Sequence, residues 1–241
     1  MKPTMITFRI FRYRAGEPGS ERYEQSTLPV EESTTVLDVL GSLHRTDRTL
    51  MFRHSCHHGS CGTCACRING REHLACLTRV LDLDSKVVTV EPLNKLHKLG
   101  DLVVDPADFF REYPSDWQTL RRSEANPGAP SPVELSAYMR LENCIECGAC
   151  VSACPVEDFL GPAVLAGLNR ERLNRQDFDR EQNDGRLHES PDREKSLLEL
   201  AAAERGVVKC QRALECSRIC PTGVYPARHI EELRRWISTP S

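Results

Sequence analysis

Twelve cysteines constrain this 241-residue chain more than any other feature, because eleven of them fall into three regularly spaced groups. The groups are Cys56-x4-Cys61-x2-Cys64-x11-Cys76, then Cys144-x2-Cys147-x2-Cys150-x3-Cys154, and finally Cys210, Cys216 and Cys220. The first residues lack the apolar core of a signal peptide, so we expect the chain to stay in the cytoplasm. In that compartment, dense cysteines indicate metal or cluster ligation rather than a disulfide framework.

The composition excludes two other classes of protein. A formal net charge of -3 and a pI near 6.3 argue against nucleic-acid binding, which needs a basic face. No stretch approaches the roughly 20 consecutive apolar residues that span a bilayer. The chain is therefore expected to bind no nucleic acid and to reach a membrane only through a partner.

The first hundred residues have the strand pattern of a β-grasp ferredoxin. Apolar and polar residues largely alternate over Met5–Tyr13, and a glycine-rich turn allows Glu21–Leu28 to return as a second strand. Thr35 and Asp38 form a capping-box pattern at the start of a predicted helix. The turn Asn69-Gly70 and the β-branched run Lys86–Val90 then indicate further strands.

The pattern changes near Leu96–Asp105 from strands to helical periodicity, which predicts two domains, residues 1–100 and 101–241. The fold class is therefore α+β, with an α-helical domain following the β-grasp domain. Two other segments of the second domain are predicted as an exposed loop, Ser123–Pro132, and a weakly structured insertion, Arg175–Arg193. Helices are predicted over Val133–Leu141, Pro162–Asn174, Lys195–Arg205 and Ala227–Trp236.

The first cysteine group has the plant-type ferredoxin arrangement, in which three thiolates of one loop and a fourth farther along hold a [2Fe–2S] cluster. The residues between the ligands are small, which leaves backbone amides free to donate to sulfur. The predicted ligands are Cys56, Cys61, Cys64 and Cys76, and the small residues are Gly59, Ser60, Gly62 and Thr63.

The second group, followed by Pro155, matches the bacterial ferredoxin run whose fourth cysteine ligates the other of two clusters. Aligning the third group on it gives Cys210-x2-Ala213-x2-Cys216-x3-Cys220-Pro221, which lacks a thiol at Ala213. One cluster then has four thiolates and is [4Fe–4S], while the other has three and is [3Fe–4S], unless water, hydroxide or another side chain holds a fourth iron. The first set is Cys144, Cys147, Cys150 and Cys220, and the second is Cys154, Cys210 and Cys216.

Three residues near the first group have simpler interpretations. Cys66 is left over, and at the start of a probable strand it is expected to be a small buried residue rather than a ligand or redox thiol. His57 and His58 lie inside the loop, but all four cysteines are present, so a Rieske centre is not expected. Both histidines are predicted to be exposed, with a flavoprotein contact as the alternative.

Taken together, these motifs make the chain resemble the iron–sulfur subunit of the succinate dehydrogenase and fumarate reductase family. The segments that carry the resemblance are Ser55-Cys56-His57-His58-Gly59-Ser60-Cys61-Gly62-Thr63-Cys64, Leu74-Ala75-Cys76, Cys144-Ile145-Glu146-Cys147-Gly148-Ala149-Cys150, Ala153-Cys154-Pro155 and Cys220-Pro221. The loop Cys144–Gly148 looks more like the fumarate-reductase branch, which implies a menaquinone-type pool.

The resemblance implies an electron wire from the FAD of a flavoprotein subunit, through the three clusters, to a quinone at a membrane anchor that can carry haem b. The substrate site of such a succinate:quinone oxidoreductase or quinol:fumarate reductase lies on the flavoprotein, and this chain has no dinucleotide fingerprint. The family's quinone contacts map onto Pro155, Phe159 and Gln211, of which only Pro155 matches the family pattern.

Two alternatives remain open at this point. The chain can serve a related flavin dehydrogenase or a thiol-driven fumarate reductase, or it can be a cluster-based redox sensor, for which no signalling module is present. The resemblance also implies a peripheral position on the inner face of the cell membrane, held there by the anchor subunit.

Overall fold

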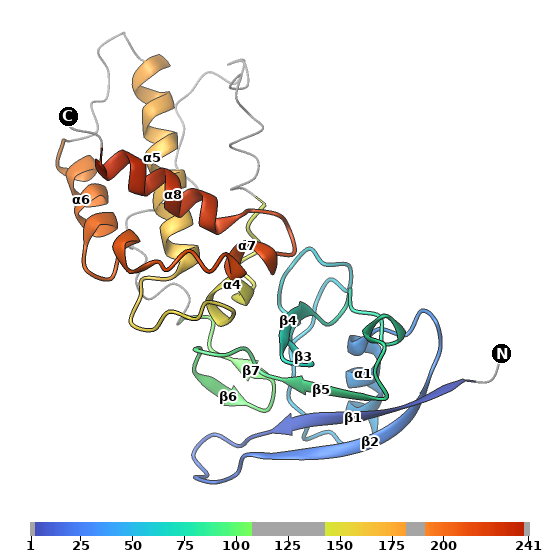
Figure 1. Cartoon of the computed structure of the whole chain (residues 1–241). Coiled ribbons are helices and arrows are strands. Elements are labelled where there is room, and N and C mark those ends of the chain that lie inside the picture. The colour runs from blue at the N-terminus through green and yellow to red at the C-terminus, as the bar shows by residue number, and fades with distance from the viewer. Residues whose placement is uncertain (1–2, 108–142, 182–190, 239–241) are drawn as a thin grey trace. The chain divides into compact units, whose positions relative to one another are not determined.

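The computed structural model describes residues 3–107, 143–181 and 191–238 (Figure 1). These residues form two compact units. The first unit contains the N-terminal residues together with 145–153 and 219–221, and the second contains the remaining described residues. The segment 145–153 and the short segment 219–221 thus belong with the N-terminal residues, although they are distant from them in sequence.

A five-stranded sheet is the centre of the first unit, with strand order β2-β1-β5-β3-β4 (Figure 1). β1 pairs parallel with β5, and the other pairs are antiparallel. This arrangement, with α1 packed against the sheet, confirms the predicted β-grasp fold. The element bounds are β1 Thr4–Arg12, β2 Arg22–Val30, α1 Val36–Thr46, β3 Ala65–Ile68, β4 Arg71–Leu74, η1 Leu81–Leu83 and β5 Val87–Glu91.

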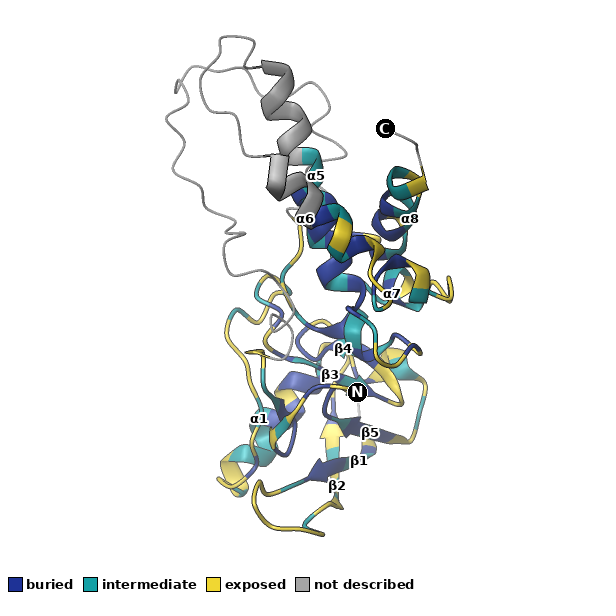
Figure 2. Ribbon diagram, turned by 90° about the vertical axis from the view of Figure 1, so that its left-hand side faces the viewer, coloured by how far each residue is buried: buried dark blue, intermediate teal, exposed yellow. Residues whose placement is uncertain are grey.

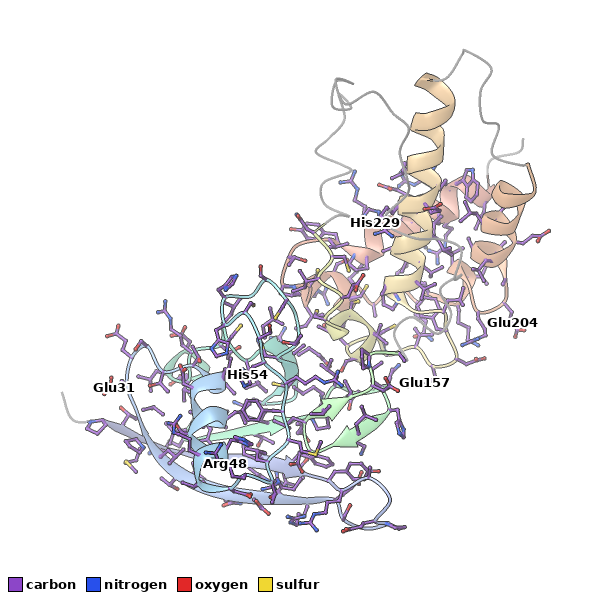
Figure 3. All side chains as sticks on the ribbon, turned by 180° about the vertical axis from the view of Figure 1, so that it is seen from behind. Glu31, Arg48, His54, Glu157, Glu204 and His229 are labelled. Carbon is purple, nitrogen blue, oxygen red and sulfur yellow. The ribbon has the colours of Figure 1, made fainter. Side chains whose placement is uncertain are left out.

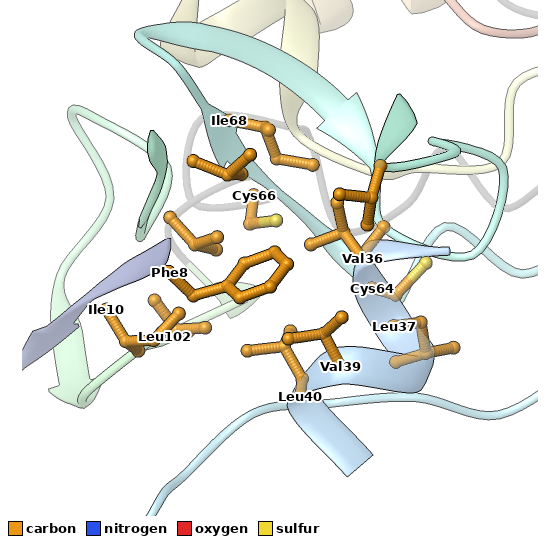
Figure 4. Close-up of a cluster of buried hydrophobic side chains, with 14 of the residues drawn as sticks. Phe8, Ile10, Val36, Leu37, Val39, Leu40, Cys64, Cys66, Ile68 and Leu102 are labelled. Carbon is orange, nitrogen blue, oxygen red and sulfur yellow. The ribbon is translucent and has the colours of Figure 1, made fainter. Parts of the chain in front are cut away.

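The helix α1 begins where the sequence predicts. The Thr35 side chain accepts from the Asp38 backbone N–H, and the Asp38 carboxylate accepts from the Thr35 N–H, so the capping box is formed. The buried face of the helix meets the fully buried Phe8 of β1 in the core of the unit (Figure 4). The core residues of α1 are Val36, Leu37, Val39 and Leu40.

The expectation that strands give way to helical periodicity over Leu96–Asp105 is wrong. This stretch forms a hairpin of β6 (Lys98–Gly100) and β7 (Val103–Val104) within the first unit. Its turn is held by the buried Asp101, whose carboxylate accepts backbone N–H groups of Tyr13 at 2.8 Å and Met51 at 2.7 Å. These distant contacts, rather than local periodicity, determine the conformation. The domain boundary at residue 100 stays a prediction.

The second unit is helical, and its core lies between three helices (Figures 1 and 2). Its elements are α5 Pro162–Glu181, α6 Pro191–Ala202, η2 Val207–Lys209, α7 Glu215–Arg218 and α8 Pro226–Ser238. Leu165, Leu168, Leu197, Ile230 and Leu233 are nearly inaccessible to solvent. Within the described residues, no helix combines the length and apolarity needed to cross a bilayer.

The sequence placed the starts of α5 and α8 to within one residue, but α6 begins at Pro191 and ends at Ala202, earlier than the predicted Lys195–Arg205. Helices do begin at Pro162 and Pro226, as the tolerance of the first helical turn for proline predicts. The insertion predicted over Arg175–Arg193 is partly wrong, because α5 continues into it and α6 begins inside it at Pro191. The predicted helix over Val133–Leu141 and the loop over Ser123–Pro132 lie outside the described residues.

His229 of α8 is a buried histidine in the second unit (Figure 3). Its Nε2–H donates to the carbonyl of Val224 at 3.1 Å, and its Nδ1 accepts from the side-chain amide of Asn169 at 2.9 Å. Both ring nitrogens are therefore satisfied in the neutral ring. Burial lowers the pKa of His229, and the cations of Arg228 and Arg172 add to this, although Glu232 opposes it.

This arrangement predicts that the second unit loses stability on acidification. The unfolded chain binds the proton at the ordinary histidine pKa of about 6.5, whereas the folded chain binds it only at lower pH. The free energy of unfolding therefore decreases as the pH falls from about 6.5 to the lowered pKa of His229 in the folded chain, and this contribution is constant at lower pH. The thermal unfolding midpoint of the cluster-loaded protein should fall less steeply over this range in His229→Gln than in the wild type. Equal slopes would contradict a neutral buried His229.

Candidate cluster-binding sites

The four cysteines of the first group converge at one end of the β-grasp sheet. Cys56 and Cys61 are half-exposed in the loop before β3, whereas Cys64 and Cys76 are buried directly before β3 and after β4. The pKa of Cys64 is raised to about 12, mainly by burial and in part by the adjacent thiols of Cys76 and Cys61. Such buried thiols hold negative charge poorly unless a bound cation replaces their protons, as iron does.

The loop presents backbone N–H groups to Cys56. The amides of Ser60 and Cys61 donate to its Sγ at 3.2 and 3.3 Å. These donors and, most strongly, the amide of His58 lower the pKa of Cys56 to about 6. Left-handed backbone at Gly59, with φ of 81°, helps turn the loop around the sulfur. The donors stabilise an anionic sulfur, so this loop fits a thiolate-bound cluster.

Part of the second group belongs to the first unit. Cys147 and Cys150 lie in the segment 145–153, which ends in the short helix α4 (Ala149–Ser152), and Cys220 lies in the segment 219–221 of the same unit. Gly148 begins α4 in the left-handed conformation, with φ of 78°. Cys144 is assigned to the second unit. Three of the four cysteines predicted to hold the [4Fe–4S] cluster are thus gathered into one compact unit.

The three cysteines predicted to hold the [3Fe–4S] cluster, Cys154, Cys210 and Cys216, lie in the second unit. Cys216 lies in α7 and is buried, and burial raises its pKa to about 11, with further contributions from the nearby Cys154 and Cys210 thiols. Ala213 is exposed in the loop that joins Cys210 to α7. Cys154 therefore lies in the same unit as Cys210 and Cys216, whereas Cys220 lies in the same unit as Cys147 and Cys150.

The described residues contain no group of three or more His, Cys, Asp or Glu side chains placed to hold a single metal ion. This is compatible with a cluster site, because cluster thiolates bind different irons around a larger object than one ion.

The other predicted residues have varied environments. Pro155 and Gln211 are exposed, whereas Phe159 is partly buried against the helical core of the second unit. Cys66 is buried in the core of the first unit, as predicted. His57 is exposed, also as predicted, and its Nε2 lies 2.9 Å from Nδ1 of His54.

Arg234 is a residue that the sequence did not single out. Its Nη2 donates to the carbonyls of Val207 at 2.6 Å and Cys210 at 3.2 Å, and its Nη1 lies 3.2 Å from the Glu231 carboxylate. Arg234 thus ties the backbone beside Cys210 to α8. An arginine in a charged amphipathic helix gives no sequence signal for such a contact, which joins residues 24 positions apart.

Comparisons with known proteins agree with both cluster motifs. Residues 7–111 match the family described as a 2Fe-2S iron-sulfur cluster binding domain, and residues 140–224 match a 4Fe-4S dicluster domain. The fumarate reductase iron-sulfur subunit of Mycobacterium tuberculosis (strain CDC 1551 / Oshkosh) is 35% identical, over 97% of this chain and 93% of that protein.

Similar relatives extend beyond that organism. The mitochondrial succinate dehydrogenase [ubiquinone] iron-sulfur subunit 1 of Oryza sativa subsp. japonica is 32% identical, over 95% of this chain and 81% of that protein. A chain of the Mycobacterium smegmatis Sdh1 complex in the apo form has the same fold, with a TM-score of 0.77 at 22% identity, covering 98% of this chain and 96% of that chain. The chain therefore belongs to the family of iron–sulfur subunits of succinate dehydrogenase and fumarate reductase.

Proposed function

We propose that this chain conducts electrons between the FAD of a flavoprotein partner and a quinone pool, through one [2Fe–2S], one [4Fe–4S] and one [3Fe–4S] cluster. The observation that carries the proposal is the cysteine pattern, in which eleven of twelve cysteines complete three ligand sets and Ala213 stands where a twelfth ligand is expected. When bound, iron–sulfur clusters supply one-electron redox chemistry over potentials from roughly -700 to +450 mV.

The ligand sets are assigned by the spacing and, apart from Cys144, supported by the compact units. Cys56, Cys61, Cys64 and Cys76 would hold the [2Fe–2S] cluster. Cys144, Cys147, Cys150 and Cys220 would hold the [4Fe–4S] cluster, and Cys154, Cys210 and Cys216 the [3Fe–4S] cluster. The grouping of Cys220 with Cys147 and Cys150, and of Cys154 with Cys210 and Cys216, supports this exchange of ligands.

The first loop is suited to electron entry. Its outer ligands, Cys56 and Cys61, are half-exposed, whereas its inner ligands are buried. A partner flavin can therefore approach from the side of Cys56, beside the exposed His57 and His58. The backbone amides that donate to Cys56 would stabilise the added negative charge of reduction, and this raises the tendency of the site to accept an electron.

The quinone end of the wire is proposed at the third ligand set. Pro155 and Gln211 directly follow two of its cysteines and are exposed, which suits contact with a quinone, while Phe159 contributes mainly to the core. A groove of about 720 Å³ opens beside Cys210 between its loop and α8, where Leu214 and Tyr225 supply exposed apolar surface. This volume lies within the range of small-molecule sites, about 300–1,000 Å³.

Flavoprotein and membrane-anchor subunits complete the proposed complex. The chain contains no dinucleotide fingerprint, so FAD and the dicarboxylate site would reside on the flavoprotein. An anchor subunit, with or without haem b, would hold the chain at the inner face of the cell membrane and give it access to ubiquinone or menaquinone.

Purification of the chain with its natural partners tests this function. We expect succinate–quinone or quinol–fumarate activity, an electron paramagnetic resonance (EPR) signal from [3Fe–4S] in the oxidised state, and a [2Fe–2S] signal on reduction. A complex that shows the signals but neither activity would instead serve another flavin dehydrogenase or a thiol-driven fumarate reductase. Absence of the [2Fe–2S] signal would contradict the proposal itself.

A further inference from the structure

Gly62, between two ligands of the first loop, packs directly against the second cysteine loop. A Cβ added to Gly62 would stand 2.7 Å from the carbonyl oxygen of Ile145 and 2.8 Å from the Cβ of Cys147. Ordinary van der Waals contact begins at 3.4 Å, so any side chain here would push the loops apart by more than half an ångström. Both loops belong to the first unit, and Ile145 and Cys147 pack on its core. The absence of a side chain therefore brings the two ligand loops into contact.

A second contact holds the same cysteine segment from the sheet side. The hydroxyl of Ser152, at the end of α4, donates to the carboxylate of Glu72 on β4 at 2.7 Å. The hydroxyl oxygen of Ser152 also accepts a hydrogen bond from the backbone N–H of Asn94 at 2.8 Å. Ser152 and Glu72 are both buried, and Arg67 lies 3.9 Å from the Glu72 carboxylate. The helix that contains Cys150 is thus held to the β-grasp sheet by a buried hydrogen-bond network, here called the Ser152–Glu72 clamp.

Apolar residues fill the space around the contact. A Cβ on Gly148 would approach Leu93 and Leu96 to 3.2 Å each, so the second loop also fits closely against the segment that follows β5. Displacement of the loop in that direction would require these leucines to move. The second cysteine loop is therefore restrained by Gly62, by the Ser152 clamp and by this leucine pair.

We infer that Gly62 and the Ser152–Glu72 clamp are positioning residues that set the separation of the [2Fe–2S] and [4Fe–4S] clusters. The inference rests on the proposed ligand sets. The step that this separation governs is a single-electron exchange, in which one cluster is oxidised and the other reduced, with no bond formed or broken and no proton moved. The electron comes from the flavoprotein partner or, in the opposite direction, from the quinol pool. Separation matters because such exchange weakens steeply with distance between the two sites.

Gly62→Ala tests the inference, and Gly70→Ala, in the turn between β3 and β4 of the same unit, is its matched control. Both glycines have left-handed backbone, with φ of 72° and 80°, so alanine imposes similar backbone strain at each. At Gly70, however, the atom nearest to the new methyl group is Nη2 of Arg67 at 3.9 Å, which is ordinary van der Waals contact, and Gly70 lies outside the cysteine loops. The control thus reproduces the strain without displacing Cys147.

The measurement is the spin relaxation of the reduced [2Fe–2S] EPR signal in the purified complex, with the [4Fe–4S] cluster oxidised and then reduced. A nearby paramagnetic cluster speeds this relaxation, and the dipolar interaction falls with the cube of the separation. We expect the enhancement to weaken in Gly62→Ala and electron transfer from flavin to quinone to slow several-fold, while Gly70→Ala keeps the wild-type enhancement. Intact signals with an unchanged enhancement in Gly62→Ala would overturn the inference, whereas absent signals in the wild type would overturn the proposed function.

Ser152→Ala supplies a second test if Gly62→Ala assembles its clusters incompletely. It removes one oxygen atom and introduces no steric clash, so the clamp is lost while the ligands remain. The relaxation enhancement should again weaken, and Glu72→Gln, which keeps an acceptor for the Ser152 hydroxyl, should retain it. Equal enhancement in Ser152→Ala and Glu72→Gln would refute the role of the clamp.

Discussion

Ala213→Cys is expected to abolish the [3Fe–4S] EPR signal of the oxidised protein, because the added thiolate completes a fourth ligand for the third cluster. The substituted position lies in the loop that already carries Cys210 and leads to Cys216, and it is exposed, so a thiol can be introduced without cost to the core. The loop would then read Cys210-x2-Cys-x2-Cys216-x3-Cys220, the full spacing of the second group. A fourth iron should bind and give a [4Fe–4S] cluster.

The consequence for function should be large. The changed cluster type would shift the reduction potential of the last cluster in the proposed wire, the one proposed to exchange electrons with quinone. We therefore expect quinone-linked turnover to fall strongly while artificial electron acceptors that collect electrons at earlier clusters are still reduced. Iron content per chain should rise by one, which chemical iron analysis measures.

Ala213→Ser is the matched control for this substitution. Serine has nearly the size of cysteine but supplies no thiolate, so the [3Fe–4S] signal and the iron content should remain those of the wild type. Retention of the oxidised signal in Ala213→Cys, with the cysteine reduced and accessible to alkylation, would show that this loop does not place residue 213 at the cluster.

Local sequence signals predicted the parts of this fold that local interactions decide. The capping residues Thr35 and Asp38 identified the start of α1, and the Asn69-Gly70 turn identified the β3–β4 hairpin, because each signal acts over a few residues. The β6–β7 hairpin was missed because its turn residue, Asp101, is held by backbone groups 50 and 88 positions away. No periodicity within the segment reports such contacts.

The candidate site likewise has features that local sequence predicts and features that depend on contacts between residues distant in sequence. Ligand spacing is local, so the sequence alone predicted a [2Fe–2S] and a [4Fe–4S] domain, which the family matches confirm, while the individual ligands and the [3Fe–4S] cluster stay predictions. The contact of Gly62 with Cys147 and the bond from Ser152 to Glu72 join residues about 80 positions apart, where one sequence carries no pairing information. The sequence indicates only that Gly62 frees backbone amides, whereas its second role depends on the neighbouring loop that packs against it.

Cys64→Ala and Cys66→Ala form the pair of variants with the sharpest expected contrast. The two cysteines are separated by one residue, both are buried, and burial raises the pKa of each thiol, so neither exposure nor acidity distinguishes them. The residues around each thiol distinguish the two cysteines. Cys64 faces the thiols of Cys76 and Cys61, whereas Cys66 lies on the inner face of β3 with Ile68, among the core residues around Phe8 (Figure 4).

Cys64→Ala should therefore lose the [2Fe–2S] EPR signal and with it nearly all electron transfer between flavin and quinone, while the [3Fe–4S] signal of the second unit persists. Cys66→Ala should keep every signal and lose only about 1 kcal/mol of stability, because it removes one sulfur atom from a packed core. The same substitution at two neighbouring positions thus separates a ligand from a packing residue. Loss of the [2Fe–2S] signal in both variants, with the Cys66→Ala protein folded, would mean that Cys66 takes part in the site and that the count of eleven ligands is too low.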